Sequence, residues 1–373
     1  MERFMTGKKW FGSIIIIMVV TLLVLAGCVF WADPFSHYRK PKEYLYYELT
    51  DQRFQNDGIT KHFDYDAIIT GTSMTENFSA SQFDELFGTN SIKVCFSGAT
   101  YKEIDDNLQV SYESGHSPKY VLRGLDYTLL VRDKDELRLD MGEYPDYLTN
   151  ANPFDDVKYL LNKDVIINYT LPSLIKYIKG EPGGHTSFDV YSYTAHNATY
   201  DKNAVLMGRS EFKAPEAINA ATDDEITMLT ENMSVNVIEL AGKHPETTFL
   251  YFFPPYSMAY FGGVKEEGNL EKELLFKEKA IDMMLEYDNI HIYSFTDALD
   301  ITTDLNRYRD VAHYDQNVNF WIIEQIAKGE GFDSEGSNAP VFRITKENKE
   351  TYVEAEKELL MNFDYNSLLG NED

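Results

Sequence analysis

Short apolar segments alternate with helical stretches from Tyr65 to Lys328, and this alternation constrains the fold more than any other feature of the sequence. The apolar segments are residues 66–70, 92–96, 120–126, 248–253 and 290–295, and the helical stretches are residues 80–87, 101–114, 223–243, 271–286 and 317–328. Strands that alternate with helices of this length form βαβ units. The sequence therefore predicts an α/β domain on a parallel sheet, over residues 59–330.

One long segment, from Tyr127 to Thr222, interrupts this alternation with several prolines, a Gly183-Gly184 pair and many tyrosines. We interpret it as an insertion, partly helical around residues 155–177, that covers one end of the sheet and shapes a substrate groove. Residues 331–373 are interpreted as a charged C-terminal extension with one amphipathic helix at residues 346–361.

The N-terminus contains an uncharged apolar run, residues 10–31, long enough to cross a bilayer as a single helix. Arg3, Lys8 and Lys9 precede it, so the positive-inside rule predicts that residues 1–9 are cytoplasmic and that the remainder is extracytoplasmic. Residues 32–58, aromatic and polar, are expected to form a stalk. An alternative is a lipoprotein, because Leu25-Ala26-Gly27-Cys28 matches the processing box, but the apolar residues after Cys28 favour an uncleaved signal anchor. Both alternatives predict a protein tethered to the cell membrane.

Charge and cysteine content exclude some classes of ligand. The 34 Lys and Arg against 61 Asp and Glu give a net charge of −27, which argues against nucleic acid. Of the two cysteines, Cys28 lies in the anchor and Cys95 in an expected strand, so neither a disulfide nor a cysteine-based metal site is expected. We expect no metal and no cofactor.

Ser73 is the candidate nucleophile. It follows the expected buried strand 66–70 and Gly71, which permits a sharp exit from the strand. Serine nucleophiles of α/β hydrolases occupy such a position between a strand and a helix. The alternative is a serine that only caps the following helix.

Two further motifs lie at expected strand ends. Asp310 precedes His313 by three residues, a spacing that lets a carboxylate contact imidazole Nδ1 and leaves Nε2 free toward a nucleophile. Gly98 follows the strand 92–96 and can present backbone N–H groups to an anion. The alternatives are a surface acid beside a helix-capping histidine, and a plain turn at Gly98.

Taken in this order, the three motifs resemble the SGNH/GDSL hydrolase superfamily, over roughly Tyr65 to Lys328. The resemblance implies a flavodoxin-like three-layer fold with Ser73 as nucleophile, His313 as general base and Asp310 orienting the base. It also implies an oxyanion hole formed by the N–H groups of Ser73 and Gly98.

The chain departs from the family pattern at two positions near the expected oxyanion hole. The usual G-D-S is Gly71-Thr72-Ser73 here, and Asp126 stands where many members have an asparagine that donates to the oxyanion. An ionised Asp126 cannot donate a hydrogen bond and would repel an oxyanion. Three alternatives follow: Asp126 is protonated, it has another role, or the hole relies on backbone donors.

An N-terminal anchor before such a domain resembles the cell-envelope branch of the superfamily. This branch includes alginate-type O-acetyltransferase proteins and the D-alanyl transfer proteins of lipoteichoic acid modification, which work beside a membrane-bound O-acyltransferase. The resemblance implies a serine esterase or O-acyltransferase acting on an envelope polysaccharide or a teichoic-acid-like polymer. The alternative is a catalytically weak module that binds envelope glycan or assists a membrane-bound acyltransferase. The tyrosines Tyr191, Tyr193 and Tyr200 and the run 253–256 could stack on sugar rings or simply pack.

Overall fold

The chain folds into two compact units, one of residues 1–63 and 142–187 and the other of residues 64–141 and 188–373. The computed structural model describes residues 7–140, 144–150, 152–194, 198–332 and 342–370. Arg3 and parts of the expected C-terminal extension therefore lie outside the described residues. The segment interpreted as one insertion is divided, because residues 142–187 belong to the unit that contains the N-terminus.

Within its described residues, the second unit is built on a six-stranded sheet with the order β3-β2-β4-β6-β7-β8. The strands are β2 (Ala67–Gly71), β3 (Ser91–Cys95), β4 (Tyr120–Gly124), β6 (Thr248–Phe253), β7 (Ile290–Ser294) and β8 (Arg343–Ile344). Neighbours from β3 to β7 pair in parallel, and β8 is antiparallel to β7. Strands β2 and β3 are buried at every position, which explains their mainly apolar sequences. The prediction of an α/β fold with parallel strands is confirmed.

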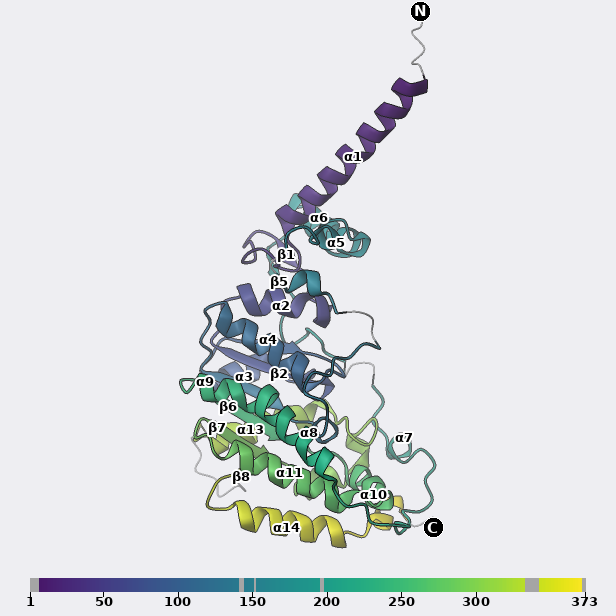
Figure 1. Ribbon diagram of the computed structural model, residues 1–373, viewed down its shortest axis with the longest axis vertical. Coiled ribbons are helices and arrows are strands. Elements are labelled where there is room, and N and C mark those ends of the chain that lie inside the picture. Colours follow the sequence, from purple (N-terminus) through teal and green to yellow (C-terminus); the bar gives the residue numbers. More distant parts are fainter. Residues whose placement is uncertain (1–6, 141–143, 151, 195–197, 333–341, 371–373) are drawn as a thin grey trace, which may run out of the picture. The chain divides into compact units, whose positions relative to one another are not determined.

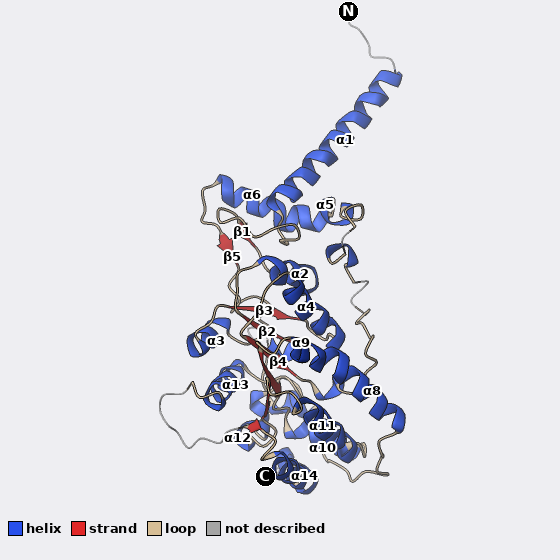
Figure 2. Cartoon of the chain, turned by 60° about the vertical axis from the view of Figure 1, so that its left-hand side comes forward, coloured by secondary structure: helices blue, strands red, loops and turns tan. Residues whose placement is uncertain are grey.

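Helices cover both faces of this sheet, as Figures 1 and 2 show. On one face are α3 (Ala80–Phe87) and α13 (Gln316–Gly329), and on the other are α4 (Tyr101–Glu113), α8 (Asp223–Met233), α9 (Glu239–Lys243) and α11 (Leu270–Met284). Capping residues determine where several of these helices begin and end. Ser79 caps α3, Gly88 ends it at φ +64°, and capping boxes with Thr100 and Thr222 begin α4 and α8. The remaining α-helices in the described part of the unit are α7 (Lys202–Leu206), α10 (Met258–Glu266), α12 (Leu299–Thr302) and α14 (Lys349–Asn362).

The C-terminal segment is an integral part of this unit. Glu356 on α14 forms a buried ion pair with Lys277 on α11, and Lys277 also donates to Ser294 Oγ at 2.7 Å. A buried ammonium is tolerated only when its donors are satisfied. The pair therefore fixes α14 against α11, and the charged composition of residues 342–370 does not indicate a solvated tail.

The N-terminal unit surrounds the end of the apolar helix α1 (Gly7–Ala32), which is long and apolar enough to cross a membrane. Its other elements, among the residues described, are β1 (Tyr46–Tyr47), α2 (Gln52–His62), a 3-10 turn (Asp146–Leu148), α5 (Val157–Leu160), a π-helical turn (Val165–Thr170), α6 (Leu171–Ile178) and β5 (Gly184–His185). Strands β1 and β5 pair in parallel. Val29, Phe35, Leu148, Tyr159 and Val165 form a small apolar core.

A single buried carboxylate organises the chain where it leaves α1. Asp33, at φ +48°, accepts the backbone N–H groups of His37, Tyr38 and Arg39 at 3.0, 2.9 and 3.1 Å. It also accepts the hydroxyl of Tyr159 at 3.1 Å. The segment expected to be a stalk is therefore folded locally at its beginning.

Candidate functional site

Ser73 lies at the first position of a 3-10 turn (Ser73–Thr75) that follows β2 directly. The turn requires glycine at the end of β2: Gly71 has φ +140°, and a Cβ there would lie 2.8 Å from Thr75 Oγ1. Thr72 caps the turn by accepting the N–H of Met74 at 3.4 Å. The backbone thus turns sharply after β2, and the Ser73 side chain is left partly exposed at the carboxyl edge of the sheet.

The structure brings Ser73, His313 and Asp310 into one hydrogen-bonded chain. Ser73 Oγ lies 2.8 Å from His313 Nε2, across 240 residues of sequence. His313 Nδ1 lies 2.9 and 2.8 Å from the two carboxylate oxygens of Asp310. Since Nδ1 faces a carboxylate, it carries the imidazole proton, and Nε2 can accept the proton of Ser73.

Asp310 is held by its own loop. Its Oδ1 accepts the N–H groups of Ala312 and His313 at 2.9 and 2.8 Å. Burial raises the pKa of Asp310, but the hydrogen bonds from His313 and the backbone outweigh burial and lower it to about 2. The carboxylate is therefore ionised at neutral pH, although its side chain is 47% exposed.

Asp126 is buried next to the turn Ser73–Thr75, and its carboxylate has two hydroxyl partners. Its Oδ2 accepts the hydroxyl of Thr72 at 2.7 Å, and its Oδ1 accepts the hydroxyl of Tyr256 at 2.6 Å. Burial raises the pKa of Asp126 above its ordinary value, and the hydrogen bonds from Tyr256 and Thr72 offset this only in part. Of the alternatives for Asp126, the geometry favours another role: the carboxylate orients Thr72, the residue before Ser73.

The Gly98 turn lies at the neighbouring strand end. Gly71 pairs with Cys95, and Phe96 N–H donates to Gly71 O at 2.8 Å, so the two loops leave the sheet at the same level. The backbone N–H groups of Ser73 and Gly98 have no acceptor within the described part of the chain. Both are therefore available to an incoming anion.

Arg138, which the sequence analysis did not single out, packs over the Gly98 turn. Its guanidinium donates to Ser97 O and, at 2.7 Å, to Asp140 Oδ1. A Cβ at Gly98, where φ is +64°, would collide with this guanidinium. Arg138 thus holds the turn through Ser97 O while its charge is paired with Asp140, and no local motif marks it among the surrounding acidic residues.

Residues 189–194 contact the segment that follows the nucleophile turn. Asp189 accepts the hydroxyl of Ser79 at 3.0 Å, and Thr194 N–H donates to Asn77 Oδ1 at 2.9 Å. Tyr191 and Tyr256 are buried, so neither is available to stack on a sugar ring. This part of the expected insertion thus flanks the site.

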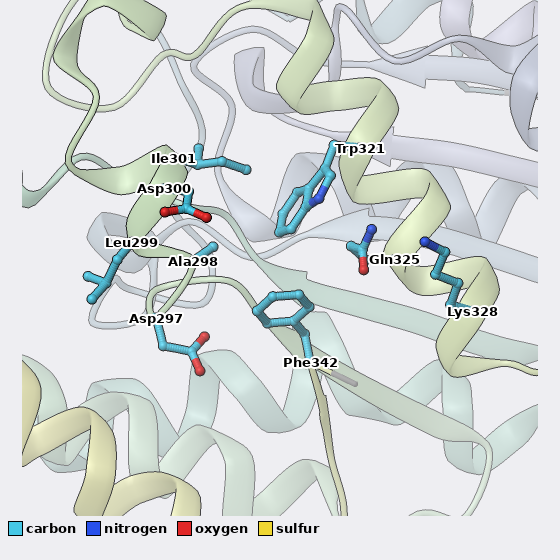
Figure 3. Close-up of a pocket in the computed structure, with 9 residues that line it drawn as sticks. All are labelled: Asp297, Ala298, Leu299, Asp300, Ile301, Trp321, Gln325, Lys328 and Phe342. Carbon is cyan, nitrogen blue, oxygen red and sulfur yellow. The ribbon is translucent and has the colours of Figure 1, made fainter. Parts of the chain in front are cut away.

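A separate cavity of about 500 Å³ lies at the carboxyl end of β7 (Figure 3). Trp321, Phe342, Gln325 and the carboxylates Asp297 and Asp300 are among its lining residues, and Ser73, His313 and Asp310 are not. Across the described ranges, no group of three His, Cys, Asp or Glu side chains is arranged to hold a metal ion.

Two comparisons with known proteins give no relative from which a role could be transferred. Neither the protein-family models nor the curated proteins contain a match to this chain. The case for a function therefore depends on the residues and geometry described above.

Proposed function

We propose that this chain is an extracytoplasmic serine esterase or O-acyltransferase that acts on acyl esters of a cell-envelope glycan or polyol polymer. The observation that carries the proposal is the hydrogen-bonded chain Ser73–His313–Asp310, with distances of 2.8 Å on both sides of the imidazole. A nucleophile, a base and an orienting acid in this geometry are the parts that acyl transfer through serine requires.

The topology supports an SGNH-like, flavodoxin-like assignment. Numbered along the chain, the parallel strands β2, β3, β4, β6 and β7 have the spatial order 2-1-3-4-5. In sheets of this order, ligands bind outside the carboxyl ends of the strands where the order reverses. Here that point lies between β2 and β4, which are followed by Ser73 and Asp126.

In the proposed mechanism, Ser73 Oγ attacks the acyl carbon of an ester while His313 Nε2 takes the hydroxyl proton. The N–H groups of Ser73 and Gly98 stabilise the oxyanion of the tetrahedral intermediate. His313 then returns the proton to the leaving alcohol, which leaves an acyl-serine. Attack by water or by a sugar hydroxyl, with His313 Nε2 taking its proton, forms the new acyl bond, and His313 returns that proton to Ser73 Oγ as the serine–acyl bond breaks.

The membrane anchor connects this chemistry to an envelope substrate. The positive residues before the apolar run favour an extracytoplasmic catalytic unit, close to surface polymers. A membrane-bound O-acyltransferase is the partner that would supply an acyl group on the transferase reading. A transferase differs from an esterase in that its site excludes water from the acyl-serine, so that a sugar hydroxyl accepts the acyl group instead.

The test is covalent labelling of the full chain, in detergent or vesicles, with a fluorophosphonate probe. We expect wild type and the control Ser114→Ala, at an exposed helix end, to be labelled, and Ser73→Ala to remain unlabelled. Peptide mapping should place the label on Ser73, and His313→Ala should slow labelling by about 10³-fold or more. Equal labelling of Ser73→Ala and wild type would remove Ser73 from the mechanism.

The cavity in Figure 3 favours a second candidate, a glycan-binding module. Trp321 and Phe342 offer ring faces, and Gln325 and Asp297 offer polar groups, a combination suited to a polyhydroxylated ring. Binding of envelope polysaccharide that is lost in Trp321→Ala, without any labelling of Ser73, would support this candidate over the enzyme.

A further inference from the structure

The helical segment from Val165 to Ile178 in the N-terminal unit carries a row of exposed apolar side chains. Ile167, Leu171, Ile175 and Ile178 are 48, 41, 49 and 80% exposed. Their spacings of four, four and three residues place them on one face of a helix. Four large exposed aliphatic side chains in a row form a contiguous patch, which is unusual on a surface that faces water.

This row is not the face that packs on the rest of the unit. Val165, Thr170 and Ser173 are the buried positions of the segment, and they lie on the opposite side. The exposed apolar row therefore points away from the rest of the unit. In a chain with a net charge of −27, residues 165–178 contain no acidic residue and one lysine.

The segment lies beside the end of the apolar helix α1. The ring of Tyr177 on α6 is 6.1 Å from that of Trp31 and 5.5 Å from that of Tyr44. Figure 1 shows α5 and α6 next to the C-terminal end of α1. Trp and Tyr rings prefer the boundary between hydrocarbon and water, so this cluster is of the type that lies at a membrane interface.

The pattern of exposed side chains along α1 also places the boundary between hydrocarbon and water near Trp31. Its large apolar side chains are exposed between Trp10 and Val24, whereas Val29 is buried in the unit. As a helix, residues 10–31 extend about 33 Å at about 1.5 Å per residue, close to the ~30 Å of a hydrocarbon core. The outer end of that core then falls near Trp31, next to α6.

We propose that residues 165–178 form an in-plane helix at the outer bilayer surface, with the exposed row in contact with lipid. The occupant of this face is lipid because the face continues the apolar surface of α1 at the point where α1 leaves the bilayer. The inference rests on α1 crossing a membrane and is independent of the ester chemistry. It gives the unit a second attachment, which limits how it can tilt on its anchor.

The test uses the full chain in phosphatidylcholine vesicles with a fluorophore at single cysteines. In a Cys28→Ser background, with Cys95 buried, Ile175→Cys and Ile178→Cys receive the label, and Lys357→Cys on the exposed face of α14 is the control. We expect lipids with a quencher near the headgroup to reduce emission at both isoleucine positions at least twofold more than at Lys357. Unfolding temperatures should match before and after labelling.

Equal quenching at the three positions would overturn the inference. The same result is expected if a partner protein, not lipid, covers the row, because the vesicles contain no such partner. A dependence on quencher depth, with stronger quenching from the headgroup region than from the acyl-chain end, would support an in-plane position and contradict insertion across the bilayer.

Discussion

Replacing Asp126 by asparagine separates two opposed effects of this carboxylate. If Asp126 acts on the oxyanion by repulsion, the neutral amide should accelerate ester turnover. If Asp126 instead orients the nucleophile turn, the amide should slow it. In the structure both carboxylate oxygens are occupied by hydroxyl donors, from Thr72 at 2.7 Å and Tyr256 at 2.6 Å. An asparagine keeps one acceptor oxygen and presents an NH₂ group to the other hydroxyl, which must then accept instead of donate, and both hydrogen bonds lose the charge of the carboxylate.

The size of the effect follows from the type of bond. A hydrogen bond to a charged group contributes about 1.5–3 kcal/mol. We expect Asp126→Asn to lower the free energy of unfolding by about that amount. If the loss falls on Thr72, the Ser73 turn is no longer held in place, and at about 1.4 kcal/mol per factor of ten the kcat/KM for an acetyl ester should fall about 10- to 100-fold.

Initial rates with an activated acetyl ester and chemical denaturation of the full chain measure the two effects. Thr72→Val removes the same bond from its other end, so the double variant should lose less stability than the two single variants added together. Tyr256→Phe removes the second hydrogen bond to Asp126, so it should lower the free energy of unfolding but change kcat/KM little. Faster turnover in Asp126→Asn, with unchanged stability, would refute the orienting role.

Three other predictions concern stability. Burial raises the pKa of Glu273 to about 7 from an ordinary 4.5, so the folded state binds an extra proton between these values and loses stability as pH rises from 4.5 to 7. The free energy of unfolding of Glu273→Gln should therefore exceed that of wild type by about 1–3 kcal/mol at pH 8 and match it near pH 4. The same difference between the two proteins at both pH values, measured by chemical denaturation, would contradict this. Gly98→Ala should lower the unfolding temperature more than Gly88→Ala, since both glycines have φ +64° but only at Gly98 must Arg138 give up its hydrogen bond to Ser97 O to make room for the methyl group. Asparagine, like aspartate, tolerates the positive φ of residue 33, but in Asp33→Asn the backbone N–H groups that donate to this side chain lose their charged acceptor. Limited proteolysis should therefore cut the N-terminal unit of this variant faster than that of wild type.

Local chemistry explains why much of the fold was predictable from the sequence. Helix α3 spans the predicted residues 80–87, because Ser79 caps its start and Gly88 ends it. Strand β6 spans the predicted residues 248–253, because a buried parallel strand is apolar at nearly every position. The two-residue strand β8 has no such pattern, since its identity depends on pairing with β7. Sequence reasoning therefore missed it.

The same distinction applies to the candidate site. Ser73 and Gly98 could be located because each follows a strand with a readable pattern. Tyr256 and Arg138 could not, because their contacts join residues 130 and 41 positions apart, and nothing near them in sequence indicates those partners. Asp126 was recognisable as a position of interest, but its role depends on burial and on two hydroxyl donors that only the folded chain supplies.

The triad itself depends less on charge than on a local turn. Asp310 is 47% exposed, so water screens its attraction for a protonated His313. Its geometry, however, is fixed: the same carboxylate accepts two backbone N–H groups of its loop and faces the imidazole Nδ1. Asp side chains readily form such turns with residues two and three positions later. The same turn therefore favours the Nδ1–H tautomer, and the spacing of three residues that indicated His313 as a candidate base in the sequence is also what holds its ring in the structure.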